Sequence, residues 1–118
     1  MSTPWNPVQV EEKIREIANE IADGVKTCYA AYAEFLTADR DYDRAFAKAY
    51  MNHQGPAHEK KYAAELATHR ERVIRDIADA AYRYADRGAR AKENELRAWQ
   101  SVGASIREQY RVAGVGER

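Results

Sequence analysis

The sequence predicts an all-α protein that folds as a long antiparallel helical hairpin. Alanine is abundant and β-branched residues are few, which is a helical composition. Residues 57–113 contain no proline, and apolar residues recur there in steps of three, four and seven, which keeps them on one helix face. The short connection before Pro56 makes the two helices antiparallel neighbours. We expect helices at about residues 7–52 and 56–113 within one domain, residues 1–118.

The start of the first helix is marked by Asn6, Pro7 and Gln9. Asn6 suits the N-cap, Pro7 suits the first helical position, and the Gln9 side chain can reach back to the cap. Trp5 and Val10 are spaced to form a hydrophobic staple across that start.

One apolar face runs along the whole first helix. Its residues follow alternating steps of four and three, as in heptads. They are Val10, Ile14, Ile17, Ile21, Gly24, Cys28, Ala31, Phe35, Ala38, Tyr42, Ala45 and Ala49. We expect Cys28 to be a buried small side chain instead of a reactive thiol.

The second helix carries an apolar stripe of its own that fits an eleven-residue repeat. The repeat places residues at 62/66, 73/77, 84/88, 95/99 and 106/110. We expect this helix to be continuous, and Asp86–Ala89 is the weakest point because Gly88 costs about 1 kcal/mol in a helix interior. Gly114 is expected to end the helix in a left-handed cap.

Each stripe is wide enough for more than one neighbour, which predicts a homo-oligomer such as a four-helix bundle. Small side chains around Gly103 favour a close helix crossing there. The residues predicted for the oligomer interface are Ile14, Ile17, Ile21, Val73, Ile77, Trp99, Val102 and Ile106.

Net charge is zero over the chain but unevenly distributed. Residues 1–45 hold five basic and nine acidic side chains, and residues 83–111 hold seven basic and four acidic ones. Two interpretations stay open: the two helices attract each other, or the second helix offers a basic surface to nucleic acid. The residues predicted to bind single-stranded nucleic acid, by phosphate contact and base stacking, are Arg83, Arg87, Arg90, Lys92 and Tyr82.

The sequence shows no pattern typical of catalysis. His53, His58 and His69 lack metal-ligand spacing, and there is no glycine-rich phosphate loop, nucleophile elbow or CxxC motif. We expect no enzyme activity, no metal and no cofactor. No apolar run is long enough to span a membrane and no signal segment is evident, so the expected location is the cytoplasm.

The second half carries a set of recognisable residues: Ala49-Tyr50-Met51, Gly55, Thr68, Arg72, Ala81-Tyr82 and, above all, the run Gln100–Arg107. In these residues it resembles a set of small helical proteins of tailed bacteriophages. The resemblance covers about residues 45–110 and implies an accessory role in DNA recombination or replication, near single-stranded DNA or a recombinase, in the cytoplasm of the bacterial host. Two other functions stay open: binding a host protein to modulate defence or takeover, and a purely structural coiled-coil oligomer.

Overall fold

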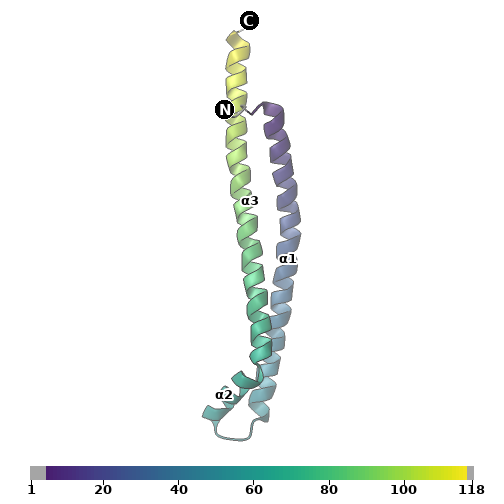
Figure 1. Cartoon of the computed structure of the whole chain (residues 1–118), viewed down its shortest axis with the longest axis vertical. Coiled ribbons are helices and arrows are strands. Elements are labelled where there is room, and N and C mark those ends of the chain that lie inside the picture. The colour runs from purple at the N-terminus through teal and green to yellow at the C-terminus, as the bar shows by residue number, and fades with distance from the viewer. Residues whose placement is uncertain (1–4, 117–118) are drawn as a thin grey trace. The chain divides into compact units, whose positions relative to one another are not determined.

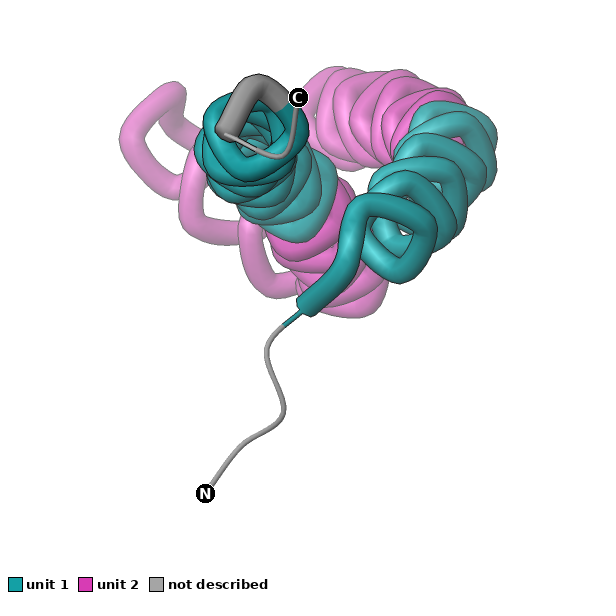
Figure 2. The backbone as a smooth tube through the Cα atoms, turned by 90° about the horizontal axis from the view of Figure 1, so that it is seen from above, with its two compact units in different colours: residues 1–26, 87–118 teal, residues 27–86 magenta. Residues whose placement is uncertain are grey.

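The computed structural model describes residues 5–116, with side chains for residues 5–114, and confirms an all-α helical hairpin. Its helices are α1 (Pro7–Asn52), α2 (Ala57–Ala67) and α3 (His69–Gly116), as Figure 1 shows, and the described residues form no strand. The chain divides into two compact units, coloured in Figure 2. Unit 1 comprises residues 1–26 and 87–118, and unit 2 comprises residues 27–86, so α1 and α3 contribute to both.

The predicted start of α1 is confirmed as a reciprocal capping box. The backbone amide of Gln9 donates to Asn6 Oδ1 at 2.9 Å, and the amide of Asn6 donates to Gln9 Oε1 at 3.0 Å. Pro7 is the first helical residue, where its missing N–H costs no helical hydrogen bond. Two of the amides at this end therefore have partners.

The connection between α1 and α2 turns at Gly55, whose φ of +153° disfavours any residue with a Cβ. A Cβ there would lie 2.8 Å from Glu59 Oε2 and 3.2 Å from His53 Nε2. Pro56 caps α2 with its carbonyl, which accepts from the amides of Glu59 and Lys60. This connection reverses the chain within unit 2.

The second helix is not continuous, which corrects the expectation of one helix over residues 56–113. It breaks at Thr68, whose φ of −113° and ψ of 20° depart from helical values. The Thr68 hydroxyl donates to the carbonyl of Ala64 at 2.6 Å, and its backbone amide donates to the same oxygen at 3.0 Å. A threonine hydroxyl that competes for a helix carbonyl favours a bend. Thr68 is buried, so its side chain is fixed in this arrangement.

At Gly88 the expected continuity is confirmed, because α3 passes without interruption through the residues named as the weakest point. The cost of one glycine is small compared with the packing of the long helix around it. The expected left-handed cap at Gly114 is wrong: α3 ends at Gly116, and Gly55 is the one glycine with positive φ in the described part of the chain.

Unit 1 has a small apolar core where the first part of α1 packs on the last part of α3. Val10 and Ile17 are each 1% exposed. Gly103 on α3 is buried, and a Cβ there would lie 3.2 Å from Val10 Cγ1, so the predicted close crossing is confirmed. Trp5 contacts Trp99 edge to face, with ring centroids 4.8 Å apart. The staple expected between Trp5 and Val10 stays a prediction.

Unit 2 is held together by aromatic and charged contacts between α1 and α3. The rings of Tyr32 and Tyr82 lie 4.9 Å apart. The guanidinium group of Arg75 lies 4.6 Å from the ring centroid of Tyr42 and 3.8 Å from Asp39 Oδ1. Arg75 therefore covers apolar surface with its stem while its charge faces a π system and a carboxylate.

The apolar face predicted for α1 is confirmed in both units, because none of its residues is exposed. The packed face of α3 differs from the predicted stripe. The residues of α3 that are not exposed follow a seven-residue repeat, together with some residues next to the repeat positions. The predicted eleven-residue repeat is therefore wrong for the face of α3 that packs on α1. The seven-residue repeat is Glu71, Arg75, Ala78, Tyr82 and Ala85 in unit 2, and Ala89, Lys92, Leu96, Trp99, Gly103 and Ile106 in unit 1.

Candidate functional site

The residues predicted to bind nucleic acid are divided between the two units. In unit 2, Arg83 Nε donates to Asp79 Oδ1 at 3.0 Å, one helical turn away, while its side chain stays largely exposed. Tyr82 packs on Tyr32 within the hairpin, so its ring already has a partner on α1. In unit 2, contacts within the chain therefore occupy the Tyr82 ring predicted to stack on a base and part of the Arg83 guanidinium predicted to contact a phosphate.

In unit 1, Lys92 joins α3 to α1 through Glu20. Its Nζ lies 2.6 Å from Glu20 Oε2 and 3.5 Å from Glu95 Oε2. The hydrogen bond from Lys92 lowers the pKa of Glu20, and the same hydrogen bond raises the pKa of Lys92. Arg87 and Arg90 have exposed side chains. Of the five residues predicted to bind nucleic acid, Lys92 is thus the one whose charge pairs with two carboxylates of the chain itself.

The Glu20–Lys92 pair predicts a pH-dependent stability of unit 1. Because the folded-state pKa of Glu20 is lowered, its contribution is present above the ordinary glutamate pKa of 4.5 and is lost as pH falls below it. Lys92, whose pKa is raised, loses its contribution as pH rises past its ordinary value of 10.5. Glu20→Gln should therefore lower the free energy of unfolding slightly at pH 7, and the difference from wild type should vanish in acid.

Urea unfolding at a series of pH values measures this difference. Glu93→Gln is the matched control, because Glu93 is exposed in the same unit and pairs with no cation among the described residues. An equal effect of both substitutions at every pH would contradict a specific role for the pair.

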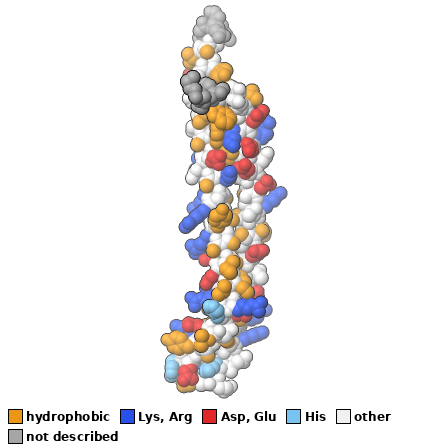
Figure 3. All heavy atoms as spheres, in the orientation of Figure 1, with side chains coloured by type: hydrophobic (Ala, Val, Ile, Leu, Met, Phe, Trp, Pro, Cys, Tyr) orange, Lys and Arg blue, Asp and Glu red, His pale blue; other side chains and the backbone are white. Residues whose placement is uncertain are grey.

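Unit 2 carries an unpartnered apolar surface on α3. Four side chains on it are 40–83% exposed: Val73, Ile74, Ile77 and Tyr84, here called the exposed stripe. Monomeric proteins rarely expose apolar side chains in such a row. Figure 3 shows apolar side chains along the helices of this unit.

A groove between α1 and α3 adjoins the exposed stripe. Ile74 and Ile77 form part of its wall, and small side chains form most of the rest. The other lining residues are Ala33, Glu34, Thr37, Ala38, Asp41, Ala78 and Ala81. Small side chains let a further helix approach closely, and the α1 edge of the groove is acidic.

The residues predicted for an oligomer interface differ in how much surface they offer. Ile17 is buried in unit 1, and Ile14, Ile21, Trp99 and Ile106 are half-buried there. Val102 in unit 1 is exposed. Val73 and Ile77, in unit 2, are 40% and 64% exposed and belong to the exposed stripe.

The hairpin end of unit 2 is a basic region that sequence reasoning did not single out. Residues 44–75 hold seven basic and three acidic side chains, a net charge of +4, and all three histidines. The two ranges whose charges were counted, residues 1–45 and 83–111, leave out nearly all of this segment. A charge count centred on the turn would have shown it. Figure 3 shows the basic and histidine side chains gathered at this end.

A hollow lined by aromatic rings lies within this basic region. It lies between the last turns of α1 and the first turns of α2. Phe46 and Tyr50 are one turn apart on α1 and stack at 6.3 Å, and Lys60 Nζ lies 5.8 Å from the Tyr50 ring centroid. The lining residues are Phe46, Tyr50, Ala57, His58, Lys61 and Tyr62.

Other features expected to bear on chemistry are reported for the described residues only. Cys28 is a free, half-buried thiol in unit 2. His53 Nε2 lies 3.8 Å from Glu59 Oε2 at the turn. No group of three or more potential metal-ligating side chains is found among the residues described. Over the same range, no helix combines the length and apolar character needed to cross a membrane.

Comparisons of this chain with protein-family models, with curated proteins and with solved structures found no match.

Proposed function

We propose that this chain is a non-catalytic binding protein that pairs with a second copy through the exposed stripe of unit 2. We further propose that the pair serves as an accessory factor in phage DNA recombination or replication, as the resemblance of residues 45–110 implies. The observation that supports pairing is the row of exposed apolar side chains on α3. Ile77 is 64% exposed and Tyr84 is 83% exposed.

The apolar area of the stripe favours burial against a partner. Covering apolar surface contributes about 25 cal/mol per Å² before the entropic cost of association is subtracted, and the single chain leaves this surface in water. Helical hairpins commonly cover such faces by forming four-helix bundles. A partner helix of the same sequence would bring a complementary row of apolar side chains.

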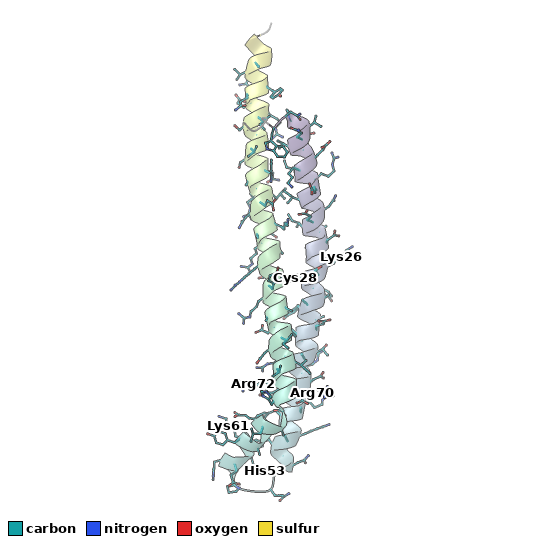
Figure 4. The ribbon with its side chains drawn as sticks, in the orientation of Figure 1. Lys26, Cys28, His53, Lys61, Arg70 and Arg72 are labelled. Atoms are coloured by element: carbon teal, nitrogen blue, oxygen red, sulfur yellow. The ribbon has the colours of Figure 1, made fainter. Side chains whose placement is uncertain are left out.

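Charge around the groove supports a second copy as the occupant. The α1 edge carries Glu34 and Asp41, whereas α3 carries Arg70 one turn before Ile74. Figure 4 shows Arg70 at the beginning of α3. When α3 of one copy lies in the groove of the other, Arg70 approaches an acidic edge, and the two-fold arrangement repeats this contact.

Sedimentation velocity at micromolar concentration tests the pairing. Wild type should sediment as a dimer, and Ile77→Lys should sediment as a monomer with unchanged helical circular dichroism, because lysine places a charge in the apolar interface. Val25→Lys is the matched control: Val25 is 61% exposed but lies outside the stripe, so this variant should remain dimeric. A monomeric wild type, or equal dissociation of both variants, would contradict the proposal.

The accessory role is tested separately by recovery of partners from host lysate with and without nuclease treatment. A recombinase or replication protein, or a complex that depends on single-stranded DNA, is the expected result. Recovery of one unrelated host protein in stoichiometric amount, unaffected by nuclease, would favour modulation of a host protein and would contradict a role beside DNA.

A further inference from the structure

We propose that the hollow at the hairpin end of unit 2 binds single-stranded DNA, with an unpaired base against its aromatic rings and the adjoining phosphates on its basic side chains. This site lies apart from the residues predicted from the sequence to bind nucleic acid. None of its lining residues belongs to the exposed stripe, so the inference stands independently of pairing between copies.

The aromatic lining supplies stacking surface. Phe46 and Tyr50 project from α1 one turn apart, and Tyr62 projects from the facing α2. Tyr62 is 64% exposed, so most of its ring is open to a ligand. Phe46 and Tyr50 already contact each other, and Lys60 lies over the Tyr50 ring, so Tyr62 is the ring of the three that leaves most surface for a base.

Basic side chains lie in the hollow and follow it in the chain. Lys61 and His58 line the hollow, and Arg72, which is not one of its lining residues, lies on α3 just after the break at Thr68. Figure 4 shows Lys61 on α2 and Arg72 at the start of α3. Lys61 and Arg72 are exposed and pair with no carboxylate among the described residues, unlike Lys92 and Arg83. Their charge is therefore available to an external anion.

This combination favours a single strand over other polyanions. Base stacking on aromatic side chains contributes about 1–3 kcal/mol per base, and cationic side chains beside the rings contact the backbone. A duplex keeps its bases stacked internally and offers phosphates alone. An anionic membrane surface offers charge and an interface that accepts tyrosine rings, but no base to stack on them, and binding to vesicles distinguishes this case.

Fluorescence anisotropy with a labelled oligothymidylate at low salt tests the site. Tyr62→Ala should weaken binding on the order of tenfold to a hundredfold by removing the exposed ring. Lys61→Gln should reduce the dependence of log affinity on log salt by about one phosphate contact. The full-length chain is used throughout, and circular dichroism checks that each variant remains helical.

Two control variants match these changes. Tyr29→Ala removes a tyrosine that is 76% exposed in the same unit but outside the hollow, and Lys26→Gln removes an exposed lysine outside the basic region. Both should bind like wild type. Figure 4 labels Lys26 on α1 and Lys61 on α2; Lys26 belongs to unit 1, whereas the hollow belongs to unit 2.

Several results would overturn the inference. They are absence of binding at low salt, equal weakening by Tyr62→Ala and Tyr29→Ala, and duplex DNA binding as tightly as the single strand. Competition by thymidine monophosphate at the same nucleotide concentration would assign the hollow to a free nucleotide instead. Phosphatidylserine vesicles that bind with the same sensitivity to Tyr62→Ala would assign it to a membrane surface.

Discussion

Ile17→Ala is expected to lower the free energy of unfolding by about 2–5 kcal/mol, the range for removing a buried isoleucine side chain. Ile17 is 1% exposed and is one of only four buried hydrophobic residues in the described part of the chain. So small a core can compensate little for a cavity, and total stabilities of small domains are about 5–15 kcal/mol. Urea unfolding followed by circular dichroism should show a large fall in the midpoint with an unchanged slope.

Two valines on α1 allow the effect of burial on the free energy of unfolding to be distinguished from the effect of helix propensity. Val10 and Val25 lie on α1 in the same unit, with 1% and 61% exposure. Val10→Ala should destabilise the protein, whereas Val25→Ala should be neutral or slightly stabilising because alanine is the better helix former. Equal effects would show that packing of α1 on α3 contributes little to the stability of unit 1.

Gly103→Leu is expected to destabilise unit 1 because α1 leaves no room for a side chain. A Cβ at this position would already lie 3.2 Å from Val10 Cγ1 and 3.7 Å from Ile14 Cδ1. The remaining atoms of leucine would have to push the two helices apart or force strained rotamers. Overpacking of this kind typically costs about 1–3 kcal/mol. Chemical unfolding measures the loss.

The same substitution at Gly88 should act in the opposite direction. No atom lies within 4 Å of a Cβ built there, and Gly88 is an exposed position in the interior of α3. Gly88→Leu should stabilise the helix by about 0.8 kcal/mol through propensity. Because both variants gain this propensity, the difference between them isolates the cost of the close crossing. Destabilisation of both to the same degree would contradict the close approach at Gly103.

The sequence was most informative where local chemistry decides the structure. The Asn6–Gln9 capping box and the heptad face of α1 follow from residue type and spacing, and both are as predicted. The break at Thr68 was not predicted, because threonine is tolerated in helices and its hydroxyl bends one here through a buried bond to Ala64. Gly88 does not interrupt α3, because the cost of one glycine is small compared with the packing of a long helix.

The face of α3 that packs on α1 was not predicted correctly, because two of its positions hold charged residues. Arg75 and Lys92 occupy packed positions, so a pattern restricted to apolar residues selects the neighbouring line with Val73 and Ile77, which is exposed. The basic region of unit 2 was missed because its charges are spread over the end of α1, α2 and the start of α3. Its aromatic hollow depends on the turn that brings Tyr62 opposite Phe46.

Arg75 and Lys92 also favour one alignment of α1 and α3 along their axes within each unit. Alanine-rich faces alone would let two helices slide by one heptad, about 10 Å, with little change in apolar contact. Such a slip would separate Arg75 from Asp39 and Lys92 from Glu20, while each cation would keep a carboxylate on α3, Asp76 or Glu95. The cross-helix pairs are partly exposed, so each favours the observed alignment only modestly. Each unit thus has one ion pair between α1 and α3 that favours the observed alignment, and a shifted hairpin would lose such a pair in each unit.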